Sequence, residues 1–235
     1  MTILFQKAQV GKLLAQLNPA QKKAVTYSDG PLLVLAGAGS GKTRVLTYRL
    51  AYFIAKGFVD PENACLLTFT NKAAGEMKAR VIDLIGTAPC FAGTFHSFCA
   101  KLLRIDGRAI GIPPSFLIYD DEDQKQAVKE IIEKLRFSPD SFSPAAVLKD
   151  ISDAKNQMLS PTQYAEFAQG DWQGAVVKIY SQYEKYLKEV GALDFDDLLL
   201  KAVELLKKNP EVLKKWHGVF THFFIDEWQD TNKVQ

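Results

Sequence analysis

The feature that most constrains the fold is an apolar run followed at once by a glycine-rich turn and a helix-period segment. Residues Leu32 to Leu35 are all apolar, which predicts a strand buried on both faces of a parallel sheet. Residues 36–43 read AGAGSGKT, and the segment from Lys42 to about Lys56 has the pattern of a helix. A buried strand, a glycine-rich turn ending in Lys-Thr and a helix, in this order, predict a phosphate-binding loop.

The residue types of this loop suit phosphate chemistry. Glycines let the chain curl so that backbone N–H groups point inward, and the start of a helix adds positive potential. We expect Lys42 to reach the β and γ phosphates of a nucleotide and the hydroxyl of Thr43 to bind Mg²⁺. Ala36 stands where the general pattern has its first glycine, and a methyl group is tolerable there if the backbone angles are ordinary. The residues expected at the phosphates are Ala36, Gly37, Ala38, Gly39, Ser40, Gly41, Lys42 and Thr43.

Two adjacent acids, Asp226 and Glu227, follow the apolar run Phe223–Ile225. Carboxylates that end a strand near a phosphate-binding loop can hold a metal ion and handle a water molecule. We expect Asp226 to bind Mg²⁺, directly or through water, and Glu227 to orient and deprotonate the water that attacks the γ-phosphate. The alternative is an acidic strand end that merely faces solvent, and the phosphate-binding loop in the same chain disfavours it.

Strands and helices alternate along much of the chain, which predicts an α/β fold with a doubly wound parallel sheet. Asn18 and Pro19 supply the N-cap and first residue of a short helix. The expected strands are 32–35, Ala64–Phe69 and His222–Ile225, and the expected helices are Lys7–Leu17, Pro19–Thr26, Lys42–Lys56 and Asn71–Ile85.

The pattern changes between about Ile112 and Gly191 to helix-period segments interrupted by prolines, with no convincing buried strand. We interpret residues 112–191 as a mostly helical subdomain inserted into a sheet domain formed by residues 1–111 and 192–235. The last helix expected in the insert, Val176–Val190, carries a stripe on one face whose spacing favours packing in a core over stacking on bases. The stripe consists of Tyr180, Tyr183 and Leu187.

Charge and cysteine content narrow the class of protein. The formal net charge of +2 and the pI near 8.3 are too mild to indicate nucleic-acid binding by themselves. Cys65, Cys90 and Cys99 have neither a paired framework nor a metal-ligand spacing, so thiols in a reducing compartment are expected. The first ten residues lack the features of a signal peptide, and no stretch approaches the length needed to span a bilayer. These features predict a cytoplasmic protein without membrane contact.

Five motifs, taken in order, resemble those of UvrD/Rep/PcrA-type superfamily 1 DNA helicases. They are Leu17–Gln21, Ala36–Arg44, Thr68–Ala74, Gly93–Ser97 and Asp226–Asn232, and similarity extends through Leu193–Leu198 to cover essentially the whole chain. AGAGSGKT is a usual form of the loop in that family, so Ala36 agrees with it. The resemblance implies a RecA-like P-loop fold, ATP and Mg²⁺ as cofactors, and single-stranded DNA and its junctions with duplex DNA as the partner.

The resemblance also implies roles for residues that would otherwise be unremarkable. It implies that Gln21 reads the edge of adenine, that Arg44 assists at the base and that Gln229 senses the γ-phosphate. Trp228 stands where the family more often has Tyr or Phe, and because an aromatic is retained we expect the metal and water roles of its neighbours to be kept.

Two motifs look like the family's contacts with single-stranded DNA. Their residues are Phe69, Thr70 and Asn71, with Thr94, Phe95 and His96 acting beside them. An aromatic ring can stack on any base for roughly 1–3 kcal/mol, and hydroxyls, amides and helix N-termini can hold phosphates. The alternative for Phe69 is a core position on an apolar strand. His96 is a poor metal candidate because no Cys or His partner stands at ligand spacing.

The sequence stops at Gln235, before the family's later motifs, second RecA-like domain or arginine finger. We therefore expect the isolated chain to hydrolyse ATP poorly and to unwind nothing, as the first half of a motor that moves 3′ to 5′ on single-stranded DNA. Its expected partners are the C-terminal helicase domain and proteins of DNA repair or replication. The alternatives are the motor part of a RecB/AddA-like helicase–nuclease, a stand-alone non-motor module that binds ATP and DNA or a decayed gene product, and, least favoured, a P-loop kinase.

Overall fold

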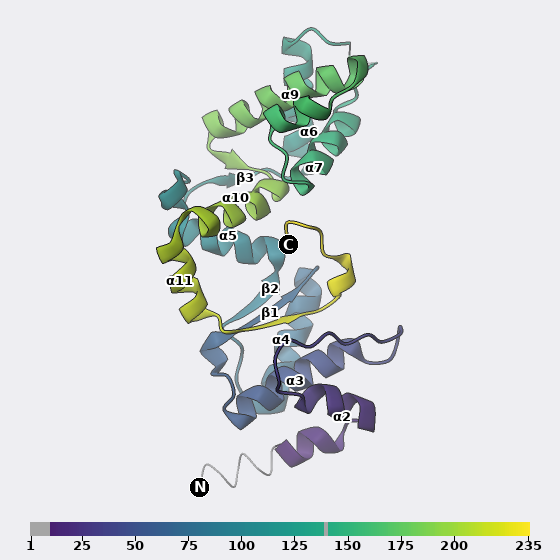
Figure 1. Ribbon diagram of the computed structural model, residues 1–235, viewed down its shortest axis with the longest axis vertical. Coiled ribbons are helices and arrows are strands. Elements are labelled where there is room, and N and C mark those ends of the chain that lie inside the picture. Colours follow the sequence, from purple (N-terminus) through teal and green to yellow (C-terminus); the bar gives the residue numbers. More distant parts are fainter. Residues whose placement is uncertain (1–9, 139–140) are drawn as a thin grey trace. The chain divides into compact units, whose positions relative to one another are not determined.

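The computed structural model describes residues 10–138 and 141–235, which divide into two compact units. The first unit holds the described residues up to Phe98 together with Leu213–Asp230, and the second holds Cys99–Val212 with Thr231–Gln235 (Figure 1). The expected helix from Lys7 to Leu17 lies partly outside the described residues, and residues 10–15 of it are helical.

A three-stranded parallel sheet forms the centre of the first unit. Its strands are β1 (Ala64–Thr68), β2 (Phe91–Thr94) and β5 (His222–Ile225), in the order β2-β1-β5. Its helices are α2 (Pro19–Thr26), α3 (Lys42–Lys56) and α4 (Asn71–Ile85), with 3-10 turns at Pro61–Asn63 and Trp228–Asp230. Helices α5 (Phe95–Asp106) and α11 (Pro210–Val219) each contribute residues to both units. The ranges predicted for α2, α3, α4 and β5 are confirmed.

The two faces of this sheet pack against different groups of side chains. On one face, Leu66 of β1 and Phe224 of β5 join the core formed with α2, α3 and α4, in which Val25, Leu50 and Val81 are fully buried. On the other face, a group of aromatic rings packs with centroids 5.4–6.1 Å apart: Phe91, Phe98, Phe220 and Phe223. Successive residues of a strand point to opposite faces, which is why Phe223 and Phe224 separate. The α/β fold class predicted from the sequence is confirmed.

Capping residues fix where these helices begin and end. The side chain of Asn18 accepts the N–H of Gln21 at 2.8 Å and starts α2, and Thr70 accepts the N–H of Ala73 at 3.1 Å and starts α4. Gly57 ends α3 in the left-handed conformation, as glycine does at many helix C-termini.

The strand expected at Leu32–Leu35 is wrong. Residues 31–37 have no regular secondary structure, and Leu33 and Leu35 are 62% and 87% exposed. An apolar run becomes a buried strand only where a neighbouring strand supplies ladder hydrogen bonds and where helices cover both faces. Within the described residues, the sheet ends at β5 and no strand pairs with this run. The glycine-rich loop nevertheless leads into α3, as expected.

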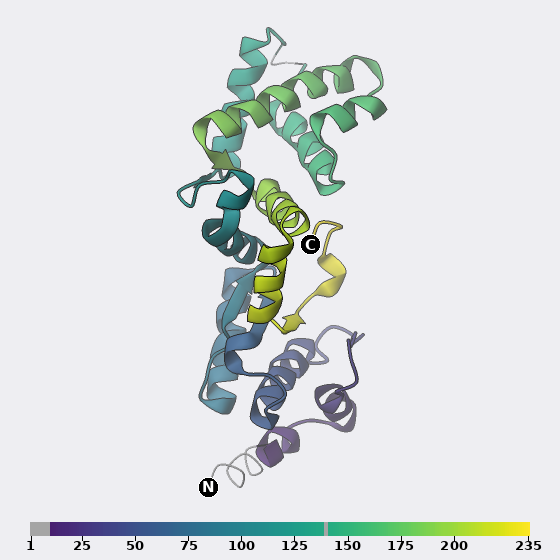
Figure 2. The same cartoon turned by 60° about the vertical axis from the view of Figure 1, so that its left-hand side comes forward.

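The second unit is mainly helical. Its elements are the 3-10 turn Gly107–Ile110, β3 (Leu117–Ile118), α6 (Asp121–Lys134), α7 (Pro144–Asn156), α8 (Pro161–Phe167), α9 (Gly170–Val190), β4 (Ala192–Leu193) and α10 (Phe195–Lys208). Two of the prolines that interrupt the pattern are first helical residues, since Ser143 and Ser160 cap α7 and α8 immediately before them. Helices α6, α7 and α9 cross one another to enclose the core of this unit (Figure 2).

The stripe on α9 packs as the sequence predicts. Tyr180, Tyr183 and Leu187 are all buried in the helical core. Helix α9 begins at Gly170, six residues before the expected start. The short strand β3, whose side chains are exposed, pairs in parallel with β4, and the proline-rich sequence pattern did not predict this pairing. The domain limits at 112 and 191 stay a prediction, because a division into compact units does not decide which residues belong to the sheet domain and which to the inserted subdomain.

The remaining expectations concern the cysteines and membrane-spanning helices. None of the three cysteines is joined to another described residue by a disulfide. Burial raises the pKa of the Cys99 thiol to about 12, so this thiol stays protonated near neutral pH. Among the helices that the structure describes, none is both long and apolar enough to cross a membrane.

Candidate functional site

The glycine-rich loop contains glycines at positions where a residue with a side chain would be strained. Gly39 and Gly41 have φ of 72° and 89°, the left-handed region that favours glycine. A Cβ on Gly41 would lie 3.1 Å from the side-chain nitrogen of Gln21, so the bare backbone also lets Gln21 approach. Lys42 and Thr43 are the first residues of α3, whose N-terminal N–H groups lack partners within the helix. The loop therefore presents a positive helix end and a lysine together.

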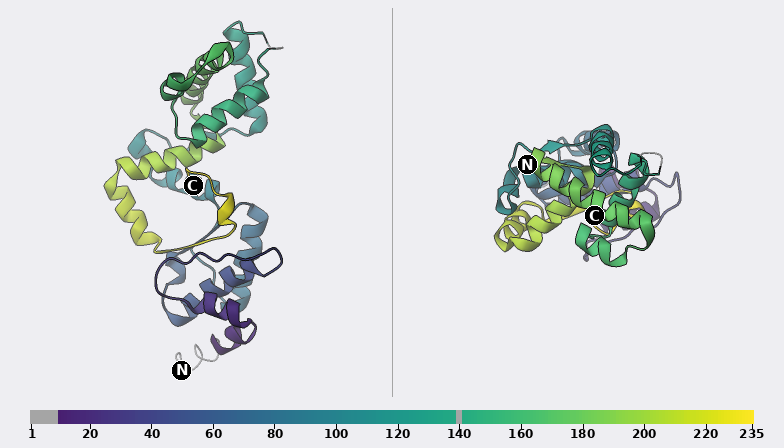
Figure 3. Two further views of the ribbon diagram at one scale, coloured as in Figure 1. Left: turned by 45° about the vertical axis from the view of Figure 1, so that its right-hand side comes forward. Right: turned by 90° about the horizontal axis from the view of Figure 1, so that it is seen from above.

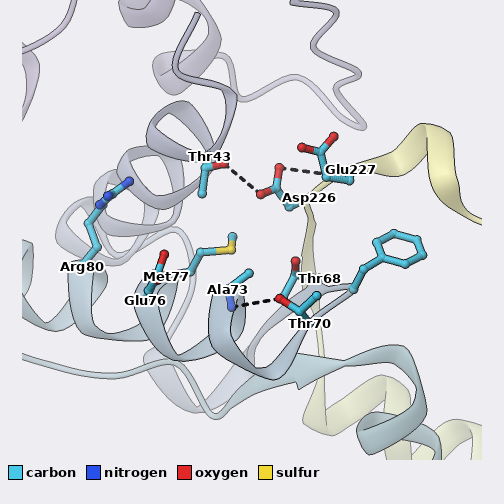
Figure 4. A pocket seen from close by; sticks show the side chains of 10 residues that line it. Thr43, Thr68, Thr70, Ala73, Glu76, Met77, Arg80, Asp226 and Glu227 are labelled. Carbon is cyan, nitrogen blue, oxygen red and sulfur yellow. Dashed lines mark hydrogen bonds between the residues drawn. The ribbon is translucent and has the colours of Figure 1, made fainter. Parts of the chain in front are cut away.

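Thr43 and Asp226, 183 residues apart in the sequence, meet at this helix end. The Thr43 hydroxyl donates to Asp226 Oδ2 at 3.0 Å, and the two side chains point toward each other in Figure 4. The Asp226 N–H donates to the Leu67 carbonyl at 2.9 Å, which extends the pairing of β5 with β1. Asp226 is 8% exposed, so the sheet and α3 fix its carboxylate in place.

Glu227 and Gln229 continue the site beyond Asp226. Glu227 has φ of 50°, a left-handed conformation that is uncommon for a residue other than glycine. Residues in this conformation are found more often at functional sites. The Glu227 N–H donates to Asp226 Oδ1 at 3.2 Å, and the Gln229 side-chain nitrogen donates to Glu227 Oε2 at 2.6 Å. The structure thus joins three of the sequence-predicted site residues in one hydrogen-bonded chain.

A pocket of about 260 Å³ opens at this point (Figure 4). Its lining consists of Thr43, Thr68, Phe69, Thr70, Ala73, Glu76, Met77, Arg80, Asp226 and Glu227. The pocket brings the predicted metal and water residues together with two of the predicted DNA-contact residues. Sequence reasoning missed the part of the lining that belongs to α4. Glu76 and Arg80 recur at helical spacing from Ala73, so the helix that follows the Thr70–Asn71 motif carried the signal.

The donor set suits Mg²⁺. A hydroxyl and a carboxylate, with their oxygens 3.0 Å apart, are the hard oxygen ligands that this ion prefers. Across residues 10–138 and 141–235 there is no group of three or more His, Cys, Asp and Glu side chains that could hold a metal ion by themselves. Mg²⁺ commonly takes one or two protein oxygens and completes its shell with water and phosphate oxygens. The residues present therefore fit an ion that binds together with a nucleotide.

Gln21 and Arg44 flank the loop on its other side. The Gln21 amide oxygen accepts the Asn18 N–H at 3.2 Å, and its amide nitrogen donates to the Ser40 carbonyl at 3.1 Å. Since an amide has two acceptor lone pairs and two N–H groups, one of each stays available. Arg44 donates to the Gln16 carbonyl at 2.9 Å, and its Nε is buried without a hydrogen-bond partner among the described atoms. Both residues expected at the base lie next to the loop.

The residues expected at DNA lie where β1 and β2 end. Thr68 and Thr94 are paired in the parallel ladder, so Phe69 and Phe95 follow at the same edge, with ring centroids 6.0 Å apart. Phe95 is buried, whereas Phe69 is 37% exposed. Asn71 opens α4, and His96 lies in the first turn of α5.

The turn after β2 is tightly built. Thr94 donates its N–H to Ser97 Oγ at 2.8 Å, and Ser97 donates its N–H to Thr94 Oγ1 at 3.1 Å. A Cβ on Gly93 would lie 2.6 Å from Ser97 Oγ, so glycine is required at this position. The Gly93–Ser97 motif therefore sets the start of α5 beside β1.

The match to a family of known proteins agrees with this geometry. Residues 17–235 match the model of the UvrD/REP helicase N-terminal domain. The chain belongs to this family. The matched range includes the glycine-rich loop, both acids and the motifs at the ends of β1 and β2.

Curated relatives give the same result in more detail. The chain is 44% identical over 226 residues to the ATP-dependent DNA helicase PcrA of Bacillus subtilis (strain 168), and 42% identical over 225 residues to that of Staphylococcus aureus (strain NCTC 8325 / PS 47). Each alignment covers 95% of this chain and 31% of the relative. The chain thus spans just under a third of the length of these family members.

Proposed function

We propose that the chain is the MgATP-binding and single-stranded-DNA-binding portion of a 3′–5′ DNA helicase. The observation that carries the proposal is the hydrogen bond between Thr43 and Asp226 beside the glycine-rich loop. It joins the first helical turn after the loop to the end of a neighbouring strand, which is where a P-loop enzyme holds Mg²⁺ and the phosphates. Relatives named ATP-dependent DNA helicases support the choice of nucleotide and polymer.

Each residue at the phosphates has one task in this proposal. Loop N–H groups and Lys42 bind the phosphate oxygens, and Thr43 and Asp226 would hold Mg²⁺, which would neutralise negative charge on the phosphates when bound. Glu227 accepts a proton from the attacking water, and Gln229, bonded to it at 2.6 Å, keeps its carboxylate oriented. Arg80 lines the same pocket and adds a cation to it.

Gln21 selects adenine through the two hydrogen-bonding positions that remain on its amide. Asn18 and Ser40 fix the amide orientation, since its oxygen faces an N–H and its nitrogen faces a carbonyl. Adenine offers an N–H donor at N6 and an acceptor at N7, which match the remaining acceptor and donor of the amide. Guanine offers two acceptors at the equivalent positions, so the same amide disfavours it. Arg44 packs at the base.

DNA binds along the edge where β1 and β2 end. Phe69 provides a half-exposed ring on which a base stacks, while the buried ring of Phe95 supports it from behind. Thr70, Asn71, Thr94 and His96 belong to the turns and helix starts around these rings and supply donors for backbone phosphates. Phe69 also lines the pocket with Glu227, which links DNA contact to the water position.

The wider activity rests on the whole protein. We propose that ATP hydrolysis drives translocation and unwinding at single-strand to duplex junctions in a cytoplasmic enzyme of DNA repair, with a C-terminal helicase domain as the closing partner. Relatives named PcrA favour this reading over a helicase–nuclease or a stand-alone module.

The test measures the binding of both ligands, MgATP and single-stranded DNA, to the same chain. Calorimetric titration with MgATP is expected to give one site per chain. In fluorescence anisotropy with a labelled oligothymidylate, Phe69→Ala is expected to weaken binding about tenfold, the size of one lost base stack. Phe167→Ala is the matched control, since Phe167 is an exposed phenylalanine of α8 in the second unit and belongs to neither the loop nor the strand ends. Equal affinity of the two variants, or no binding of MgATP, would contradict the proposal.

A further inference from the structure

Arg49 of α3 clasps the C-terminal end of α2. Its Nη1 donates to the carbonyl oxygens of Ala24 at 2.8 Å, Val25 at 3.4 Å and Tyr27. The guanidinium carbon lies 4.3 Å from the centroid of the Phe53 ring. Figure 3 shows α2 lying against α3. A cation at the carboxyl end of a helix satisfies carbonyls that lack partners within the helix and complements the helix dipole.

Helix α2 needs such an anchor because it is only eight residues long. Isolated helices shorter than about 12 residues are marginal in water, so contacts with the rest of the molecule must hold this one. Val25 is its one buried residue, and Gln21, in its first turn, is tied to the loop by a single bond to the Ser40 carbonyl at 3.1 Å. The direction of α2, and with it the position of the Gln21 amide, therefore depends on its other end.

We propose that Arg49 is a positioning residue for recognition of the nucleotide base: by clasping the end of α2, it places the amide of Gln21 against adenine. This inference rests on the proposed function, in which Gln21 selects adenine. Among the described residues, the hydrogen bonds and ring contact of Arg49 reach only α2, the residue that follows it and Phe53, and none reaches the loop or the Thr43–Asp226 pair, so we expect phosphate binding to be independent of it. Loss of Arg49 should impair the base side of the site and spare the phosphate side.

The experiment separates the two sides by using two probes on the full chain. Affinities for MgATP, MgGTP and magnesium tripolyphosphate are measured by calorimetry for the unmodified chain, Arg49→Gln, Arg49→Lys and Lys56→Gln. Lys56 is an exposed cation of the same helix that lies near the Tyr52 ring and forms no hydrogen bond with α2 among the described residues, so Lys56→Gln is the matched control.

Arg49→Gln is expected to weaken MgATP binding about tenfold, the size of one lost bidentate base contact, and to erase most of the preference for ATP over GTP. The tripolyphosphate affinity of Arg49→Gln should stay within about twofold of that of the unmodified chain. The MgATP affinity of Arg49→Lys should lie between those of Arg49→Gln and the unmodified chain, and Lys56→Gln should match the unmodified chain.

Three results would overturn the inference in different ways. An equal loss of ATP and tripolyphosphate affinity would show that Arg49 only supports the fold of the unit. Unchanged ATP affinity in Arg49→Gln would show that the clasp has no part in base recognition. Failure of the unmodified chain to bind either probe would contradict the proposed function itself, and this inference with it.

Discussion

Two places in the molecule group a lysine with carboxylates, and they differ in what surrounds the charges. In the second unit, Lys155 of α7 is 1% exposed, and its Nζ lies 2.8 Å from Asp194 Oδ2, 2.7 Å from Asp197 Oδ1 and 2.8 Å from Glu184 Oε1. In the first unit, Lys42 is partly exposed at the start of α3 and forms no ion pair with the residues that the structure describes.

The difference separates a self-contained group of ion pairs from the proposed nucleotide site. The Lys155 cluster directs its charges at one another, and Tyr183 adds a hydrogen bond to Asp194 at 3.1 Å, so little capacity is left for a ligand. In the first unit, Thr43 and Asp226 line a pocket, and Lys42 precedes Thr43 at a helix end that favours anions. Motif letters alone do not make this distinction, since both places combine Lys with Asp. Burial and pairing make it.

The largest effect is expected from removing the buried lysine. Lys155→Met keeps the apolar stem and leaves Asp194 and Asp197 buried without their cation. Breaking a buried pair in this way costs roughly 3–5 kcal/mol of unfolding free energy. Urea denaturation followed by circular dichroism measures it. Lys149→Met is the matched control, because Lys149 pairs with Asp153 at 2.7 Å on the exposed face of the same helix and should give no measurable change. Equal stability of the two variants would remove the distinction between the sites.

The second prediction reverses this pattern in the first unit. Lys42→Met is expected to weaken MgATP binding by about 10- to 100-fold, the size of losing charge-assisted bonds to phosphate. Its unfolding free energy should stay within about 0.5 kcal/mol of the parent, as for other substitutions away from packing contacts. Calorimetry and urea denaturation measure the two quantities. A destabilised Lys42→Met protein would place Lys42 with Lys155 as a structural residue.

A third effect is expected from pH. Burial raises the pKa of Asp197 from 3.8 to about 7, and the negative charge of Asp194 contributes while Lys155 opposes the shift. Burial also disfavours the charge of Lys155, but Asp197, Asp194 and Glu184 outweigh it and raise the pKa of Lys155 well above its usual value. Between the two values for Asp197, the folded state holds a proton that the unfolded state has lost.

Stability from this group should therefore fall as pH rises from about 4 to about 7. Lys155 is charged in both states over that range and adds no slope. Urea denaturation across this pH range measures the trend, and Asp197→Asn should flatten it. A slope that survives in Asp197→Asn would assign the pH dependence to other groups.

The smallest effect is expected at the edge of the pocket. Arg80→Gln should weaken MgATP binding about fivefold, since an exposed cation contributes modestly, and should leave folding unchanged. Lys78→Gln, also on α4 but outside the pocket lining, serves as the control in the same calorimetric assay. If both variants lost affinity equally, the effect would come from general charge and not from the pocket.

Much of the fold could be predicted because local signals were strong. The bounds of α3 follow from a loop glycine before Lys42 and from Gly57 after Lys56, and those of α2 follow from the Asn18 cap. The strand at Leu32–Leu35 failed because an apolar run says nothing about whether a neighbour is present to pair with it. The short strand β2 was missed because its sequence, Phe91 to Thr94, contains only one large apolar residue.

The site followed a similar rule. The meeting of Thr43 with Asp226 could be anticipated because Thr43 follows a glycine-rich loop, Asp226 follows an apolar run, and strand ends gather at one edge of a parallel sheet. The bond of Gln21 to Ser40 and the contribution of Arg80 could not, because they depend on how α2 and α4 pack. The Lys155 cluster was also invisible, since no local pattern shows that Lys155 of α7 and Glu184 of α9 pack against Asp194 and Asp197 at the start of α10.

Dependence of ATP affinity on Mg²⁺ tests the central distinction most directly. ATP titrations with and without Mg²⁺ are compared for the unmodified chain, Asp226→Asn and Asp194→Asn, with urea denaturation of each. We predict that Asp226→Asn folds with near-parental stability but loses the increase in affinity that Mg²⁺ brings, whereas Asp194→Asn is destabilised and, where folded, keeps that increase. The same Mg²⁺ dependence in Asp226→Asn as in the parent would contradict the assignment of Thr43 and Asp226 as the site of the metal.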